Sequence, residues 1–175
     1  MPSIISHPAV PLAIGIGLGS GIVSKRLLLA GVLCSIAPDL DVYAEMYTSS
    51  IGHRGITHSV FFALLCSAFA ALTAPHLDSR PLIAFLFVFF ATASHGMLDA
   101  FTNGGSAISF LWPFRTEGYF MPFQVIEVSP LGLLRFFSER GAAVLASELK
   151  WVWSPALLLG VLLYAMRRAV PSAKR

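Results

Sequence analysis

The chain has 175 residues, of which 56% are hydrophobic and 12% are charged, with a net charge of +3. Soluble domains carry about 25% charged residues, so this chain has too few charges to cover a water-soluble surface. A soluble enzyme, a disordered tail and a disulfide scaffold are all disfavoured. We therefore expect an all-α integral membrane protein whose residues 1–175 form a single domain.

Five apolar segments follow one another and predict a bundle of about five helices. They cover approximately residues 9–23, 27–37, 56–74, 81–101 and 151–169. A full crossing of a bilayer takes about 20 residues, so the first two segments are short and either tilt or pack against the others. The aromatic-rich stretch 102–150 is expected to be an extramembrane insertion. Within it, an amphipathic helix near 130–149 would lie on the outer leaflet.

Basic residues predict how the chain is oriented in a bacterial-type inner membrane. Lys25 and Arg26 follow the first segment, Arg80 precedes the fourth, and Arg167 and Arg168 end the fifth. Basic residues prefer the cytoplasmic side, which leaves the N-terminus and the 102–150 stretch outside. Five basic residues count against this orientation: Arg54, Arg115, Arg135, Arg140 and Lys150.

A run of alternating glycines, Gly15, Gly17, Gly19 and Gly21, lies in the first segment. A nucleotide-binding glycine loop must follow a strand and open a helix, and this run does neither. The spacing is instead typical of closely packed membrane helices.

Ionisable side chains are costly at membrane depth and usually mark function. Four clusters stand out: His7, residues 38–41 (PDLD), residues 53–59 (HRGITHS) and residues 94–99 (SHGMLD). Following the segments alternately through a bilayer brings all four clusters to the same face. His76, with Asp78 and Arg80, falls on the opposite face and serves as a comparison.

These clusters are typical of a metal site. His95 and Asp99 are four residues apart, so their side chains share one helix face. Asp39 stands at a helix end, where a carboxylate opposes the helix dipole unless a cation is present. Imidazole and carboxylate ligands suit Zn²⁺ or Mn²⁺. The expected ligands are His7, Asp39, His53, His58, His95 and Asp99, which would suffice for one or two ions.

Each of these residues also has a purely structural interpretation. His7 could be an interfacial hydrogen-bonding group, Asp39 or Asp41 a helix cap, and His95 and Asp99 a hydrogen-bonded pair. A Ser–His–Asp hydrolase is a further alternative, because Ser59 and Ser94 each neighbour a histidine. It is disfavoured because no GxSxG turn is present and adjacent helical residues point apart.

Together the motifs resemble the YdjM family of inner-membrane, metal-dependent hydrolases. The resemblance covers about residues 1–165. It rests on His7, the PDLD motif, the HRGITHS motif, and residues 95–99 continuing into Thr102, Asn103, Gly104 and Gly105. More distantly, the pattern is similar to the all-α fold of zinc-dependent phospholipase C. The resemblance implies zinc-type ions acting on a phosphoester.

Our hypothesis is a membrane-embedded, metal-dependent hydrolase that cleaves a phosphoester of a lipid or another amphiphile at the outer face. Asp41 would orient an imidazole or act as a general base, and Arg54 would bind a substrate phosphate. Backbone N–H groups of the turn formed by Thr102, Asn103, Gly104 and Gly105 would bind the same anion. The aromatic segment 110–123 would admit an acyl or isoprenoid chain.

The expected partners are the bilayer and an amphiphilic substrate, with no nucleic acid, and the sequence names no protein partner. The competing hypothesis is a metal-binding or metal-transporting membrane protein, or a structural one stabilised by metal, without hydrolytic activity. Transport is disfavoured because the polar residues gather at one face and do not line a path across the membrane.

Overall fold

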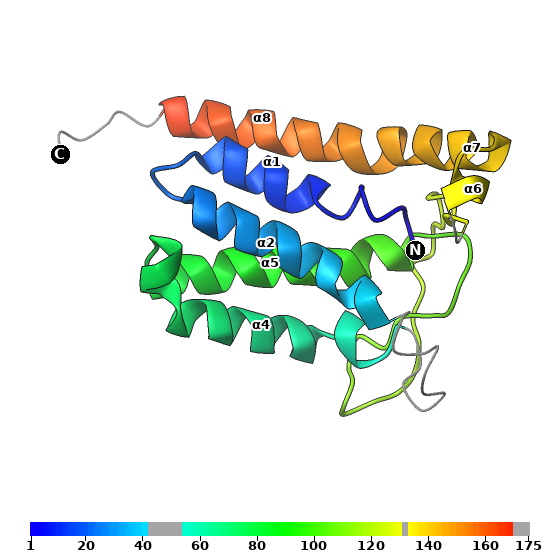
Figure 1. Cartoon of the computed structure of the whole chain (residues 1–175), viewed down its shortest axis with the longest axis horizontal. Helices are drawn as coiled ribbons and strands as arrows, with labels where there is room; N and C mark the ends of the chain where they lie inside the picture. The colour runs from blue at the N-terminus through cyan, green and yellow to red at the C-terminus, as the bar shows by residue number, and fades with distance from the viewer. Residues whose placement is uncertain (42–53, 131–132, 170–175) are drawn as a thin grey trace.

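The computed structural model describes residues 1–41, 54–130 and 133–169, whose regular secondary structure is helical, with a long non-helical stretch after the helix that ends at residue 100 (Figure 1). The α-helices are α1 (Ala9–Leu18), α2 (Lys25–Ile36), α4 (Val60–Leu72), α5 (Pro81–Ala100), α6 (Leu133–Phe136), α7 (Glu139–Glu148) and α8 (Ser154–Ala169). Single 3₁₀ turns are η1 (Ala37–Leu40), η2 (Ile56–His58) and η3 (Ala74–Leu77), and η4 (Leu149–Trp153) is a π turn. No strand occurs in the described ranges, only two isolated bridges, which confirms the all-α prediction.

The long helices lie side by side, with α1 between α8 and α2, and α5 packed against both α2 and α4 (Figure 1). Local sequence sets where they begin. The hydroxyl of Ser24 accepts a hydrogen bond from the Leu27 N–H and caps α2, and Ser59 caps α4 in the same way. Pro81 opens α5, where its missing N–H costs nothing.

The expected amphipathic helix near 130–149 is not separate from the last apolar segment. Residues Glu139–Ala169 form one helix of 31 residues. The turn η4 precedes Pro155, whose ring cannot fit against the carbonyl four residues earlier in an α-helix. A π turn widens the spacing at this point, and the Ser154 N–H bonds the Leu149 carbonyl. The helix therefore continues through a proline.

The glycine run forms the predicted close helix contact, but it does not lie within a single helix. A Cβ on Gly17 would lie 2.8 Å from the Gly160 carbonyl oxygen, so α1 and α8 are in close backbone contact there. The first helix, however, ends at Leu18, because Gly19 has a φ of +76° and turns the chain toward α2. The predicted extension of the helix to residue 23 is therefore wrong.

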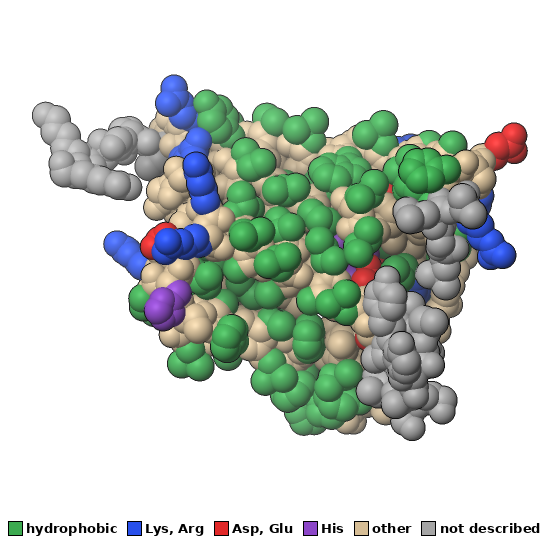
Figure 2. Space-filling view, in the orientation of Figure 1, with side chains coloured by type: hydrophobic (Ala, Val, Ile, Leu, Met, Phe, Trp, Pro, Cys, Tyr) green, Lys and Arg blue, Asp and Glu red, His purple; other side chains and the backbone are tan. Residues whose placement is uncertain are grey.

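The outside of the bundle is apolar. Phe69, Leu72 and Leu157 are 69%, 83% and 70% exposed, and hydrophobic side chains cover most of the visible face in Figure 2. Lys and Arg side chains gather at the end where α8 finishes and α1 turns into α2. Extended apolar surfaces of this kind mark membrane or protein contacts. Among the described helices, α5 and the 139–169 helix are long and apolar enough to cross a bilayer, while α1 and α4 are shorter.

Candidate metal centre

The end of the bundle opposite this basic edge collects the polar clusters. The residues of these clusters lie in the segment before α1, in the turns η1 and η2, and in the last turns of α5. The described residues brought together are His7, Asp39, Asp41, Arg54, His58, His95 and Asp99. The remaining predicted ligand, His53, lies outside the described residues. By contrast His76 is exposed in η3, at the other end.

Four buried side chains form the centre of this cluster. Asp39, His58, His95 and Asp99 each place one ligand atom within 4.8 Å of all the others. The Nε2 atoms of His58 and His95 are 3.0 Å apart. Asp99 Oδ2 lies 3.3 Å from His58 Nε2, and Asp39 Oδ1 lies 3.4 Å from His95 Nε2. Nitrogens bound at about 2.0–2.1 Å to one tetrahedral Zn²⁺ lie about 3.3–3.4 Å apart. The observed spacings are close to the edges of a single coordination shell.

His7 adds a third imidazole to the two imidazoles and two carboxylates at the centre of the cluster. Its ring is fully buried and stacks on His95, with centroids 3.8 Å apart. Its Nε2 is 3.5 Å from Asp39 Oδ2 and 3.8 Å from Asp99 Oδ1. The other oxygen of each carboxylate faces the central histidines, Asp39 Oδ1 toward His95 and Asp99 Oδ2 toward His58. Each carboxylate therefore lies between His7 and one central histidine. Burial lowers the pKa of His7 to about 3, which keeps the imidazole in its neutral, metal-binding form.

Hydrogen bonds outside the cluster fix both central imidazoles. His95 Nδ1 lies 2.7 Å from the Ser35 carbonyl, which only accepts, so Nδ1 carries the hydrogen and Nε2 a lone pair. His58 Nδ1 lies 3.0 Å from Thr57 Oγ1 and 3.3 Å from Asp41 Oδ2, and the Thr57 hydroxyl donates to Asp41. His58 Nε2 therefore points inward, toward His95 Nε2. Two ring nitrogens 3.0 Å apart require a shared proton or a cation between them.

The charge of the cluster also favours a cation. The cluster contains three aspartates, Asp39, Asp41 and Asp99, and one guanidinium, that of Arg54 against Asp99, so these side chains carry an excess of two negative charges when the imidazoles are neutral. Burial raises the pKa of Asp39, but the imidazoles of His95 and His7 lower it further than burial raises it. The carboxylate therefore stays ionised. Buried charges of this kind are paired or bind metal.

Several atoms of the cluster lack a hydrogen-bond partner within the described part of the chain. They are both ring nitrogens of His7, both oxygens of Asp39, both oxygens of Asp99, and Arg54 Nε. Their neighbours lie within ion-pair range, but not in line for hydrogen bonds. About 90% or more of buried polar groups are hydrogen-bonded, and each exception costs about 1–3 kcal/mol. Six of these seven atoms belong to predicted ligands, and coordination of a metal would satisfy the carboxylate oxygens and one of the two His7 nitrogens.

Arg54, predicted to bind a substrate phosphate, is itself buried in the protein, with 1% of its surface exposed. Its Nη1 donates to the carbonyls of Gly104 and Ser106, at 3.3 and 2.5 Å, and its Nε lies 3.3 Å from Asp99 Oδ2. Gly105 has a φ of +87°, and a Cβ there would lie 2.8 Å from the guanidinium carbon. The guanidinium thus holds the 102–106 turn against Asp99, and phosphate binding by Arg54 stays a prediction.

The side chains of the predicted anion-binding turn are engaged within the protein. The buried Thr102 hydroxyl donates to the Asp99 carbonyl at 2.6 Å. Asn103 Oδ1 accepts from the Val128 N–H at 3.0 Å. These bonds connect the end of α5 to the loop that follows, and anion binding by the turn stays a prediction.

Sequence reasoning missed one buried acid, Glu148, at the end of α7. Its carboxylate accepts hydrogen bonds from Ser3 and Ser6, next to His7. The signal was present, because Glu148 stands at the edge of an apolar segment in a chain with few charges. The serine-nucleophile alternative gains no support, since the Ser59 hydroxyl donates to the Ile56 carbonyl and caps α4.

An apolar helical bundle with a buried His and Asp cluster at one end defines a class of membrane-type protein that could hold a metal ion. Residues 1–170 match the family described as YdjM inner membrane protein. The chain is also 41% identical over 173 residues to inner membrane protein YbcI of Escherichia coli (strain K12), a match that covers 96% of this chain and all of that protein. The chain therefore belongs to the YdjM inner membrane protein family, as its motifs indicated. No solved structure matches it.

Proposed function

We propose that the protein is a membrane-embedded hydrolase that depends on a divalent metal, with Zn²⁺ favoured over Mn²⁺. The observation that carries the proposal is that three predicted ligands, His7, Asp39 and Asp99, have buried polar atoms without hydrogen-bond partners among the described residues. Asp39, His58, His95 and Asp99 would hold one ion. His7 would complete this shell or bind a second ion through the outer oxygens of the two aspartates. His53 stays a predicted further ligand.

A divalent ion in such a site supplies a Lewis acid and a water with a pKa near 7. The residues of the chain supply orientation. Asp41 and Thr57 hold the His58 ring so that Nε2 faces the cluster, and the Ser35 carbonyl does the same for His95. Of the two roles predicted for Asp41, the geometry supports orientation over general-base catalysis.

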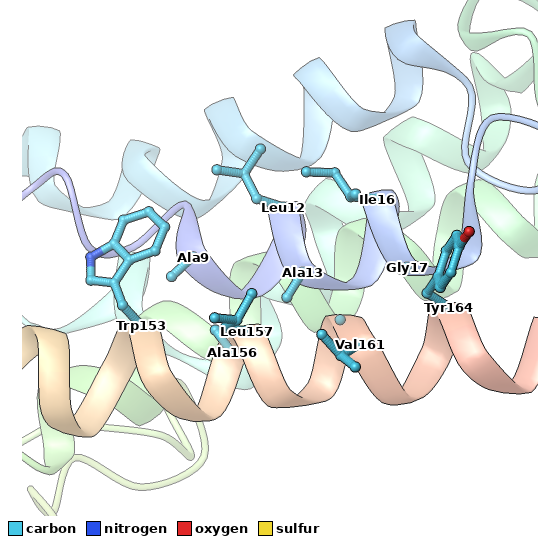
Figure 3. Close-up of a pocket in the computed structure, with 11 residues that line it drawn as sticks. Ala9, Leu12, Ala13, Ile16, Gly17, Trp153, Ala156, Leu157, Val161 and Tyr164 are labelled. Carbon is cyan, nitrogen blue, oxygen red and sulfur yellow. The ribbon is translucent and has the colours of Figure 1, made fainter.

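An apolar groove between α1 and α8 supports an amphiphilic substrate (Figure 3). Its cavity measures about 360 Å³ and runs from Ala9 and Trp153 to Gly17 and Tyr164. The end at Ala9 and Trp153, on the left in Figure 3, lies close to the cluster, because Ala9 follows His7 by two residues and Trp153 bonds to Ser6. We place the hydrocarbon chain of the substrate in this groove instead of against the aromatic 110–123 segment, with its phosphoester at the metal.

We further propose that the cluster lies at the outer face of the inner membrane. Lys25, Arg26, Arg80, Arg167 and Arg168 belong to the opposite end of the bundle, which the preference for basic residues assigns to the cytoplasm. One of the five opposing residues, Arg54, is buried against Asp99 and does not contribute to the surface charge.

Metal analysis of the purified protein, followed by an assay on phospholipids and lipid pyrophosphates with and without chelator, tests the proposal. We expect bound Zn²⁺ in near-integral amount and turnover that the chelator abolishes. A His95→Ala, Asp99→Ala double variant should lose both. The matched control is His76→Ala, Asp78→Ala, which removes the same residue types from the other end of the bundle.

The assay also separates the proposal from its alternatives. Stoichiometric metal with no turnover on any ester, amide or phosphoester would identify a metal-stabilised structural protein. Metal that crosses the membrane of a reconstituted vesicle would identify a transporter. Wild-type metal content in the His95, Asp99 double variant would exclude the ligand set itself.

A further inference from the structure

Glu148 is a carboxylate buried to 1% exposure at the junction of α7 and η4. It accepts three hydrogen bonds, all from the segment before α1: from the Ser3 N–H, from the Ser3 hydroxyl at 2.6 Å, and from the Ser6 hydroxyl at 2.8 Å. A buried carboxylate is stable only when donors satisfy it in this way. The three bonds therefore fix the N-terminal segment to the last long helix.

The π turn makes this contact possible. A π turn brings residue i+5 nearly over residue i, which an α-helix does not. Glu148 and Trp153, five residues apart across η4, accordingly both reach Ser6, and the Trp153 indole N–H donates to the Ser6 hydroxyl at 3.1 Å. The Ser6 hydroxyl thus joins both side chains.

Ser6 is adjacent to His7, and this fixes where the His7 ring lies. The Ser6 N–H bonds the Ser3 carbonyl and the Ser6 carbonyl accepts from the Ala9 N–H, so His7 stands between two anchored points. The atoms of the His7 ring itself have no hydrogen-bond partner in the described chain. Its stacking on His95 and its approach to Asp39 and Asp99 therefore depend on the backbone that carries it.

We propose that Glu148 is a positioning residue of the metal centre, holding His7 in the cluster through Ser3 and Ser6. This inference rests on the proposed function, in that it takes His7 as a ligand. It assigns a role to an acid whose hydrogen bonds go to Ser3 and Ser6 and not to a predicted ligand. It also makes residues 3–7, which precede α1, a structural part of the site.

The first test is a double-mutant cycle on metal affinity, measured by chelator competition with Zn²⁺. Glu148→Ala should weaken binding by about 10–100-fold, as loss of a residue supporting a metal ligand does. Glu148→Gln keeps one carbonyl acceptor, so its Zn²⁺ affinity should lie between those of Glu148→Ala and wild type. Glu139→Ala, an exposed glutamate at the start of α7, is the matched control and should bind normally.

The cycle separates positioning from general stability. If Glu148 acts through His7, adding Glu148→Ala to a His7→Ala variant should weaken binding no further. Independent effects, in which the two losses multiply, would overturn the proposal. The Co²⁺ absorption spectrum of Glu148→Ala should in turn resemble that of His7→Ala.

The second test needs neither metal nor activity. Diethylpyrocarbonate modification of the chelator-treated protein, mapped by mass spectrometry, should leave His7 protected in wild type and modified in Glu148→Ala, with His58 and His95 protected in both. Equal protection of His7 in the two proteins would overturn the positioning role even if the enzyme proposal held. Conversely, a chain without hydrolytic activity would still show the change at His7.

Discussion

Asp41 illustrates how a single side chain contributes to the centre without being a central ligand. It accepts hydrogen bonds from the Thr57 hydroxyl at 2.6 Å and the Arg54 N–H at 3.3 Å, and it faces His58 Nδ1. One carboxylate thus connects the turn η2 to the chain before it. A carboxylate behind a metal-binding imidazole both orients the ring and makes it more basic.

We expect Asp41→Asn to lower Zn²⁺ affinity by about 10–100-fold while the protein remains folded. The amide can still accept from Thr57 but no longer carries the charge that supports His58. Chelator competition measures the change. Asp78→Asn, an exposed acid paired with Arg26 at the other end of the bundle, is the control. Unchanged affinity in Asp41→Asn would remove Asp41 from the centre.

Gly105 is a position where the addition of a single Cβ atom is expected to lower the stability of the protein. Its φ of +87° is unfavourable for other residues, and a Cβ would lie 2.8 Å from the Arg54 guanidinium. Gly105→Ala should therefore lower stability by about 1–3 kcal/mol, seen as a lower midpoint of thermal unfolding in detergent. Ser106→Ala, in the same turn, keeps the carbonyl that accepts from Arg54 and should unfold like wild type. Equal midpoints for both variants would contradict the described turn.

At this scale the sequence predicts which candidate ligands come together better than it predicts the groups that support them. The spacing of His95 and Asp99, and the scarcity of other charges, were enough to select residues that do come together. The partners of Arg54 are carbonyl groups about 50 residues away, and every residue has a carbonyl. No side-chain pattern could therefore distinguish a buried clamp from a phosphate-binding arginine.

Among the helices, α1 and α8 form the pair with the most direct functional consequence. They approach closely at Gly17 and Gly160 and leave the groove of Figure 3 along their length. Val161 lines this groove and is 54% exposed, whereas Leu158 on the same helix is 60% exposed and does not line it.

We expect Val161→Trp to reduce activity on a long-chain substrate at least several-fold while sparing a short-chain analogue, because the indole would occupy the space of the hydrocarbon chain. Leu158→Trp places the same bulk outside the groove and should leave both activities unchanged. The ratio of kcat/KM values for the two substrates measures the effect. A parallel loss on both substrates would argue against the groove as the chain site.

Hydropathy located the helices but not their ends. Four of the five apolar segments contain one long helix each, and their boundaries follow local residues such as Ser24, Gly19 and Pro81. The fifth segment extends back to Glu139. A charged first half and an apolar second half suggested two elements, but backbone hydrogen bonding continues across a change of side-chain polarity.

On the scale of the whole molecule, the basic edge and the metal cluster lie at opposite ends of the bundle. The sequence predicted this arrangement by following the segments alternately through a bilayer. It did not predict how completely the cluster is enclosed, since His7, His95 and Asp99 are all 0% exposed. Enclosure depends on contacts between residues 3 and 148, a separation that no local pattern reveals.

Orientation is tested by labelling single cysteines with a membrane-impermeant maleimide, in a chain whose Cys34 and Cys66 are replaced by serine. We expect Phe114→Cys, in an exposed loop at the cluster end, to react in intact spheroplasts. Asp78→Cys, at the basic end, should react only after lysis. The opposite result would place the cluster on the cytoplasmic side.

The bond between Ser6 and Glu148 spans 142 residues, and this has a consequence for biosynthesis. During translation His7 is synthesised near the start, whereas Glu148 is added only when about five-sixths of the chain is complete. Until then Ser3 and Ser6 lack the carboxylate that accepts their hydrogen bonds, so a metal site that needs His7 held in place would not be complete during insertion of the early helices. We therefore expect loading of the proposed ion to follow translation, and a chain truncated before the last helix to carry most of the candidate ligands without a complete site.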